Sequence, residues 1–219
     1  MIFLKYFIII FLLFTTNGCI YNFHKQNNDS LKIYYHNKYI EDFSFCLAKN
    51  IEFMNSVIFK YRNRIMSGMG YGKIDYNNKS FDIVCFTNLG FKLFQISKKE
   101  DQITSDFFIK EFSINKGFYK IINNDMESIF LDWTFLEDYK FYQNRNYAVF
   151  VDKNIKYIFD KKNRYLIQKI YYKNNKKIYS IFYFDYIKEN SKIYPKNIKL
   201  INYKYKYQFL LKIKDIKIL

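Results

Sequence analysis

Short apolar stretches separated by turns rich in Asn, Gly and Lys run through most of the chain. Between residues 66 and 97, three apolar runs are broken at residues 77–78 (Asn-Asn) and 88–90 (Asn-Leu-Gly). Residues of these types form the tight turns that connect antiparallel strands. The pattern therefore predicts a three-stranded meander in this part of the chain.

Three of the six glycines, Gly68, Gly70 and Gly72, occupy alternate positions in the first of these strands. Side chains alternate between the two faces of a strand, so these glycines leave one face as bare backbone. A helix of the same chain or the acyl chain of a ligand can cover such a face, and the pattern alone allows both.

Two segments carry apolar residues at every third or fourth position, as an amphipathic helix does. They span residues 39–54 and 117–133, and both are candidates to cover the glycine face. In the second segment, Asn124, Glu127 and Asp132 lie away from the apolar side.

After residue 146 the sequence consists of strands separated by turns that contain Lys and Asn. The expected strands span residues 147–151, 155–159, 165–172, 178–188, 192–202 and 203–219. In the last strand the odd-numbered residues from Tyr203 to Ile213 are apolar, and the phase reverses at Asp215 as it does at a β-bulge. Before residue 147 we expect a strand at 56–65, one or two short strands within 102–114, and a long connection at 135–146 with the length of a mobile flap.

Two of the expected strands, residues 92–97 and 165–172, are apolar on both faces, so they are buried on both sides or face a cavity. The elements together number about nine to eleven strands and two helices, with the hairpins late in the chain. The sequence therefore predicts an α+β fold: a large curved antiparallel sheet, or half-barrel, with about two helices packed on its concave side.

The N-terminus has the order of a secretory signal, with Lys5, an apolar run over residues 6–14, and then small and polar residues. The run is shorter than the ~20 residues of a membrane-spanning helix. Residues 16–19 (Thr-Asn-Gly-Cys) resemble the lipobox of bacterial lipoproteins, in which a small residue precedes an acylated cysteine. We expect a signal peptide (1–18), a lipid on Cys19, a tether (19–37) and one domain (38–219). Cleavage of an unlipidated secreted protein and an uncleaved anchor are the alternatives.

Composition narrows the range of partners. Lys and Arg number 36 against 20 Asp and Glu, a net charge of +16, but only four are arginines. Specific recognition of phosphates and bases depends on arginine, so we do not expect nucleic acid as a partner. The abundance of Lys, Asn, Ile, Tyr and Phe is typical of an AT-rich genome, and attraction to anionic lipid head groups is the other explanation.

No residue cluster indicates catalysis. If Cys19 is acylated, Cys46 and Cys85 are the only thiols left in the domain. They could form one disulfide, but we favour two buried free thiols. His24 and His36 lack the spacing of zinc ligands. No nucleophile–base motif and no phosphate-binding glycine loop occurs, so we expect neither an enzyme nor a cofactor.

The order of these features resembles the lipoprotein-localisation-factor clan, the LolA/LolB-like proteins, and especially the uncharacterised outer-membrane lipoproteins of this group. The resemblance lies in the G-x-G-x-G strand and in residues 87–94 (TNLGFKLF) and 194–200 (YPKNIKL). It implies a half-barrel whose concave apolar face holds acyl chains. It also implies a protruding apolar loop residue that helps to pass a lipoprotein from a periplasmic carrier to the membrane, and Leu89 and Phe91 are candidates for it.

We therefore expect a lipoprotein that carries palmitate or a similar acyl chain on Cys19. We expect it on the periplasmic face of the outer membrane of a Gram-negative-type bacterium. It would bind lipid or lipoprotein acyl chains in an apolar cavity, in the trafficking of lipids or lipoproteins. The candidate ligand contacts are Gly68, Gly70, Gly72, Leu89, Phe91 and Phe94. The alternative is a structural lipoprotein of an envelope complex, which predicts an exposed apolar patch or sheet edge and no ligand cavity.

Overall fold

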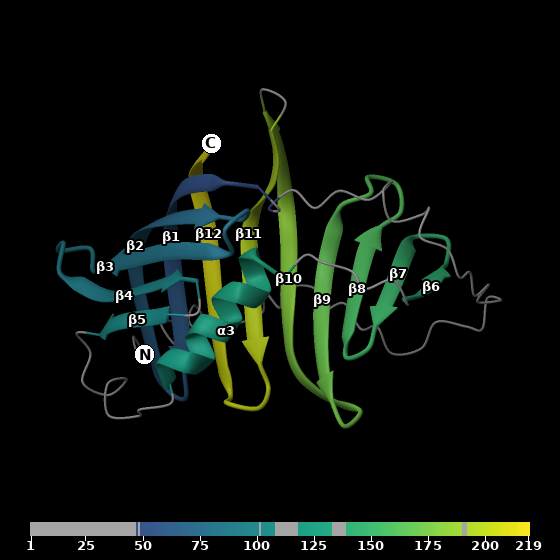
Figure 1. Ribbon diagram of the computed structural model, residues 1–219, viewed down its shortest axis with the longest axis horizontal. Helices are drawn as coiled ribbons and strands as arrows, with labels where there is room; N and C mark the ends of the chain where they lie inside the picture. Colours follow the sequence, from purple (N-terminus) through teal and green to yellow (C-terminus); the bar gives the residue numbers. More distant parts are fainter. Residues whose placement is uncertain (1–46, 48, 101, 108–117, 133–138, 190–191) are drawn as a thin grey trace, which may run out of the picture. The chain divides into compact units, whose positions relative to one another are not determined.

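The computed structural model describes residues 47, 49–100, 102–107, 118–132, 139–189 and 192–219, all within one compact unit at 32–219. This part of the chain contains one helix and twelve strands (Figure 1). In chain order they are β1 (Ile51–Tyr61), β2 (Arg64–Asp75), β3 (Ser80–Phe86), β4 (Lys92–Lys99), β5 (Gln102–Phe107), α3 (Phe118–Phe130), β6 (Lys140–Gln143), β7 (Tyr147–Asp152), β8 (Ile155–Asp160), β9 (Leu166–Lys173), β10 (Lys176–Glu189), β11 (Lys192–Asn202) and β12 (Tyr207–Ile218).

All twelve strands belong to one open sheet in the order β5-β4-β3-β2-β1-β12-β11-β10-β9-β8-β7-β6. Each neighbouring pair is antiparallel, and β1 pairs with both β2 and the C-terminal strand β12. The sheet is curved, because β2 to β5 run across the direction of β9 to β12 (Figure 1). The predicted class, α+β with a large curved antiparallel sheet, is therefore correct.

The predicted meander is confirmed. It consists of β2, β3 and β4, and its turns lie at the expected Asn and Gly residues. In the first turn the Asp75 carboxylate accepts a hydrogen bond from the backbone N–H of Asn78 at 3.1 Å. In the second, the N–H of Gly90 donates to the Thr87 carbonyl at 3.0 Å, and Gly90 has a φ of +85°, which favours glycine.

The late hairpins also follow the sequence pattern. Asn174 and Asn175 both have positive φ between β9 and β10, as a two-residue turn that follows the twist of the strands requires. The predicted bulge is present, because the pairing of β1 with β12 shifts register opposite Ile213 and Asp215.

The expected strand at 203–219 begins four residues later than predicted. Residues 203–206 form a turn, in which the Asn202 side chain accepts a hydrogen bond from the N–H of Tyr205 at 3.0 Å and Lys206 has positive φ. Tyr203 and Tyr205 are consequently exposed, whereas Tyr207 begins the buried stripe. A side-chain hydrogen bond to the backbone therefore ends an alternation that the apolar pattern continues.

The helix expected at 39–54 is contradicted where the structure describes it, because residues 51–54 belong to β1. Ile51, Phe53, Val57 and Phe59 are all buried, so the apolar residues follow a period of two as well as the helical spacing. The pairing of β1 with β2 and β12 favours the strand. Residues 39–46 lie outside the described residues. The strand expected at 56–65 instead spans a hairpin turn between β1 and β2.

Two smaller expectations change as well. The connection expected at 135–146 contains β6, which pairs with β7 at one edge of the sheet. Residues 133–138 lie outside the described part. Of the short strands expected within 102–114, β5 is present at the other edge and pairs with β4. The described chain therefore has twelve strands rather than nine to eleven, and one helix rather than two.

The second expected helix is α3, and it packs on one face of the sheet, here called the inner face (Figure 1). Phe130 of α3 stacks on Phe53 of β1 with ring centroids 5.3 Å apart. Ile122, Met126 and Ile129 are buried on the same helix. The core extends beyond α3 to β6, β7 and β8, where Phe150 packs between Phe141 and Phe159.

Candidate functional site

The three alternate glycines of β2 lie on the inner face and are buried, as predicted. Their bare backbone is covered by side chains of the neighbouring strands and by backbone carbonyls of β3: a Cβ atom would overlap the Phe86 oxygen at Gly68 and lie 2.5 Å from the Val84 oxygen at Gly70. A Cβ atom at Gly72 would overlap the ring of Phe53 on β1. A Cβ atom at Gly70 would come within 2.9 Å of the Asn55 Oδ1 atom, and one at Gly68 within 2.8 Å of the Cys85 Sγ atom. The glycines therefore make room for these three side chains.

Asn55 is the polar member of this layer. It is buried in the core, and neither its Oδ1 nor its Nδ2 atom has a hydrogen-bond partner among the described residues. A buried amide without partners costs free energy, because it loses its hydrogen bonds to water. Asn55 is therefore an unsatisfied amide in the buried layer of the inner face, within the described residues.

Polar contacts from the sheet hold the middle of α3. The hydroxyl group of Tyr207 on β12 donates to the buried carboxyl group of Asp125. Ser128 shares a hydrogen bond of 2.7 Å with the hydroxyl of Tyr179 on β10. Lys98 on β4 forms a salt bridge of 2.6 Å with Glu127. Glu127 therefore contacts the sheet, although the helical pattern placed it on the side away from the core.

A buried lysine holds the C-terminal end of the helix. The Lys169 amine on β9 donates to the carbonyl oxygens of Ser128 at 2.8 Å and Asp132 at 2.5 Å. The last carbonyls of a helix have no partner within the helix and carry its partial negative charge. Tyr183 adds a hydrogen bond to the Ile129 carbonyl at 3.2 Å. The sheet therefore caps α3 with side chains that lie far from it in the sequence.

Burial changes the protonation of the groups around this end of the helix. It lowers the pKa of Lys169 to about 7, which the charge of Asp132 partly opposes. It raises the pKa of Asp125 well above its ordinary value, because burial disfavours the charged carboxylate. Asp132 also accepts a hydrogen bond from Tyr171 at 2.5 Å. The interface between α3 and the sheet therefore holds polar groups whose protonation differs from that in water.

The turn between β3 and β4 carries two exposed apolar side chains at the end of a hairpin (Figure 1). Leu89 is 85% exposed and Phe91 is 63% exposed. The N–H of Phe91 donates to the Thr87 hydroxyl at 3.1 Å, and the N–H of Thr87 donates to the Phe91 carbonyl at 2.7 Å. These bonds close the turn at its base, so it presents Leu89 and Phe91 to the solvent.

The candidate ligand contacts are therefore divided between two places. Gly68, Gly70 and Gly72 lie on the inner face, and Phe94 is half-buried against the same core. Leu89 and Phe91 lie in the exposed turn. The sequence did not single out Asn55, Asp125 or Lys169. A lysine inside the two-sided apolar run at 165–172 is the one signal that could have identified Lys169.

The face opposite α3, here called the outward face, carries a group of exposed apolar side chains. Met54 pairs with Tyr71 and Met69 pairs with Phe86 across adjacent strands. Ile58 lies four residues after Met54, on the same face of β1. These residues form the outward patch: Met54, Ile58, Met69, Tyr71 and Phe86.

Other predicted features have different outcomes. Cys85 is a buried free thiol, and burial raises its pKa to about 11. β9 is buried on both faces as expected, whereas in β4 only Ile96 is fully buried. Cys19, Cys46, His24, His36, the signal and the tether lie outside the described residues. Within the described part, no helix is long and apolar enough to cross a membrane, and no three His, Cys, Asp or Glu residues are placed to hold a metal ion.

Comparison with known proteins finds similarity of structure only. No protein-family model matches the sequence, and no curated protein matches it. The fold is similar to the crystal structure of a LolA superfamily protein from Nitrosomonas europaea, with a TM-score of 0.50 and 8% identity over 82% of this chain and 90% of that one. An outer membrane lipoprotein-sorting protein domain from Vibrio parahaemolyticus has a TM-score of 0.48 and 7% identity, over 78% and 86% of the two chains. The LolA-like fold expected from the sequence is confirmed.

Proposed function

We propose that this chain is a lipoprotein, anchored through Cys19 on the periplasmic face of the outer membrane, that binds lipid or the acyl chains of another lipoprotein. The observation that carries the proposal is the exposed apolar turn of Leu89 and Phe91 in a chain with a LolA-like fold. Exposed apolar side chains at the end of a hairpin gain free energy when they enter an apolar phase. The turn is suited to contact the membrane at which acyl chains are delivered.

The inner face of the sheet is the proposed place for the acyl chain. Each CH2 group moved there from water contributes about 0.8 kcal/mol. The residues of this face are mostly buried against α3 and each other. A chain bound beside Phe94 and the glycines therefore displaces inner side chains or α3 from the sheet. An ester or amide group of the bound molecule would pair with the Asn55 side chain, which has no hydrogen-bond partner among the described residues.

The proposed cycle has two steps. A periplasmic carrier hands over the acylated molecule, and the inner face holds its chains out of water. The turn then enters the membrane, and the chains transfer to the bilayer, where all of their CH2 groups are again in an apolar phase. No bond is made or broken in either step, so the proposed function is binding and transfer.

The experiment tests holding and delivery separately. The full chain is purified, and copurified lipid is detected by native mass spectrometry. Transfer of a fluorescent acylated lipid to vesicles is then measured for the wild type and for the double variant Leu89→Ser/Phe91→Ser. Losing the partial membrane burial of both side chains removes about 3 kcal/mol, so we expect transfer to slow roughly 100-fold while bound lipid is retained.

The matched control is Tyr203→Ser/Tyr205→Ser, which removes two exposed aromatic side chains from a different turn. We expect this control to transfer lipid at the wild-type rate. A wild-type chain that carries no lipid and transfers none would overturn the proposal. The anchor is tested with Cys19→Ser, which should lose both palmitate labelling and fractionation with the outer membrane.

The outward patch is the observation that favours the alternative function, a structural lipoprotein of an envelope complex, because an exposed apolar patch is what that function predicts. Crosslinking in cells distinguishes the two functions by the molecule that it captures. Crosslinking in cells should recover one dominant protein partner, without bound lipid, if the chain is a scaffold.

A further inference from the structure

We propose that the outward face of β1, β2 and β12 docks on the surface of an anionic membrane, with the outward patch in the head-group layer and the lysines of β12 against the lipid phosphates. The proposal goes beyond acyl binding, because it concerns the opposite face of the sheet and does not need a ligand site. It assigns a partner to a surface that the proposed transfer step does not use.

The apolar side chains of the outward patch form one continuous group. Met54 is 55% exposed and Met69 is 46% exposed. Met54 lies opposite Tyr71, and Met69 lies two residues from Tyr71 on the same face and opposite Phe86. Side chains that are direct or diagonal neighbours on one face of a sheet are in contact range. Contiguous exposed apolar groups mark surfaces that bind a partner or a membrane.

Positive charge from lysines lies beside the outward patch. Lys60, Lys212, Lys214 and Lys217 are exposed on the outward face, and none forms a salt bridge within the described residues. The Lys214 amine lies 3.5 Å from the sulfur of Met69, so the charge is directly next to the apolar group.

The acidic side chains on this face offset part of that charge. Glu52 is paired with Lys73 at 3.3 Å, and the Asp82 carboxylate accepts hydrogen bonds from Ser97 and Gln95. Asp215 is the remaining exposed carboxylate on these strands. Ser97 and Gln95 are neutral, so Asp82 keeps its charge, and four lysines lie against two carboxylates, Asp82 and Asp215. The net positive charge that remains matches an anionic surface.

The methionine, lysine and tyrosine side chains of this face are of types that suit a membrane interface. Methionine is flexible and polarisable, so it adapts to an irregular surface. Lysine extends a charged amine from an apolar stem, which allows it to reach phosphates while the stem stays among apolar groups. A tyrosine in the patch has the amphipathic character that is common at membrane interfaces. A lipid head-group layer has both components, phosphates and adjoining acyl chains, that such a surface binds.

The experiment measures binding of the full chain to vesicles. Every sample carries Cys19→Ser, so that acyl chains contribute nothing and a failure of the anchor does not affect the result. Cosedimentation is compared between phosphatidylcholine vesicles with and without phosphatidylglycerol. The ratio of the two partition coefficients is the measured quantity, because it cancels contributions that do not depend on lipid charge.

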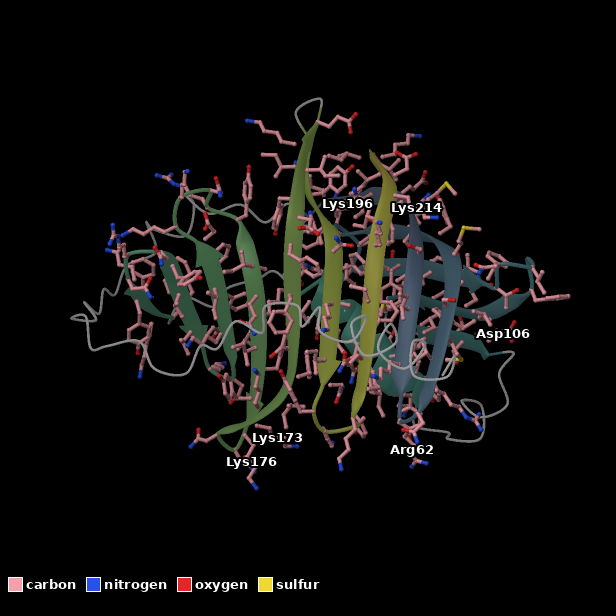
Figure 2. All side chains as sticks on the ribbon, turned by 180° about the vertical axis from the view of Figure 1, so that it is seen from behind. Arg62, Asp106, Lys173, Lys176, Lys196 and Lys214 are labelled. Carbon is pink, nitrogen blue, oxygen red and sulfur yellow. The ribbon has the colours of Figure 1, made fainter. Side chains whose placement is uncertain are left out.

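The charge variant is Lys212→Gln/Lys214→Gln, and its matched control is Lys173→Gln/Lys176→Gln at the β9–β10 turn. Figure 2 shows Lys214 on the outward face near the upper end of β12, and Lys173 and Lys176 at the lower end of the β9–β10 hairpin. A lysine at an anionic surface contributes about fivefold to binding, so the charge variant should lower the ratio about 25-fold. The control should leave it unchanged, and salt should weaken wild-type binding.

The apolar variant is Met54→Ser/Met69→Ser, which should lower binding to the anionic vesicles about tenfold, because both side chains would otherwise be buried on docking. Equal losses in the charge variant and its control would overturn the proposal, since net charge alone would then explain binding. An absence of preference for phosphatidylglycerol would overturn it too. A dimer in solution that the apolar variant disrupts, without a change in vesicle binding, would assign this face to a second copy of the chain instead.

Discussion

Lys169 should make the stability of this protein depend on pH in the neutral and alkaline range. Burial lowers the pKa of its amine from 10.5 to about 7 in the folded state. Between these two values the unfolded chain binds a proton that the folded chain does not. The free energy of unfolding therefore rises with pH through this window, and the contribution is lost as the pH falls through 7.

The size of the effect follows from the two pKa values. The difference between 10.5 and about 7 corresponds to about 5 kcal/mol over the whole window, at about 1.4 kcal/mol per pH unit. Between about pH 6 and about pH 9 the expected gain is about 2–3 kcal/mol. The hydrogen bonds to the carbonyls of Ser128 and Asp132 favour the charged amine, so these figures are upper limits.

The assay is urea unfolding of the wild type and of Lys169→Met at these two pH values. Methionine has similar length and does not titrate, so the variant should lack this gain. Lys173→Met is the control, because Lys173 is exposed at the end of the same strand. Groups that are not coupled to Lys169 titrate equally in all three proteins, so the difference between them reports Lys169 together with its neighbour Asp132.

The reasoning would be refuted if Lys169→Met gained as much stability with pH as the wild type. At the lower pH, the variant loses the two hydrogen bonds to the end of α3 but also removes a buried charge, so its stability there does not test the argument. The difference in pH dependence between the wild type and the variant does, because Lys169→Met removes the titration of this amine.

Three further predictions concern the inner face. The wild type should lose stability as rising pH passes the raised pKa of Asp125, and Asp125→Asn should not show this loss. The melting temperature as a function of pH measures the difference. Gly72→Ala should lower the free energy of unfolding by about 1–3 kcal/mol, because the new Cβ overlaps the Phe53 ring, whereas Ser67→Ala on the outward side of the same strand should change it little. Asn55→Leu should raise stability by about 1 kcal/mol, because it replaces a buried amide that has no partner in the described part of the chain, and should reduce any copurified lipid if Asn55 contacts the ligand. Urea unfolding and native mass spectrometry measure these two outcomes.

The strands of this protein could be predicted from the sequence because their signals are local. Turn residues such as Asn174, Asn175 and Gly90 fix the backbone within a few positions, and alternation with period two identifies the buried side of a strand. The expected helix at 39–54 is wrong over residues 51–54 because the apolar residues there satisfy two periods at once. Pairing with a strand more than 150 residues away decides between them, and no local pattern records that pairing.

The polar contacts of α3 could not be predicted for a related reason. Asp125, Glu127 and Lys169 are charged residues that an amphipathic pattern places in solvent, yet each contacts a partner across the interface between helix and sheet. Such contacts depend on the register of two distant elements. The glycine stripe shows the same limit, because the pattern located the bare face correctly but predicted a helix or an acyl chain as its cover. Atoms of the neighbouring strands β1 and β3 lie against it instead.

The location of the exposed apolar side chains separates the two proposals for this chain. The glycine stripe no longer requires a ligand to cover it, so the claim for acyl binding depends on the fold and on the turn. Leu89 and Phe91 lie at the end of a hairpin, whereas Met54 and Met69 lie on the outward face of the sheet. A membrane that contacts both would orient the domain as well as accept its cargo. The serine variants of the turn should therefore slow transfer without changing the preference for anionic lipid, and the glutamine variants of β12 should do the reverse. One variant that abolished both would show that turn and face act as a single surface.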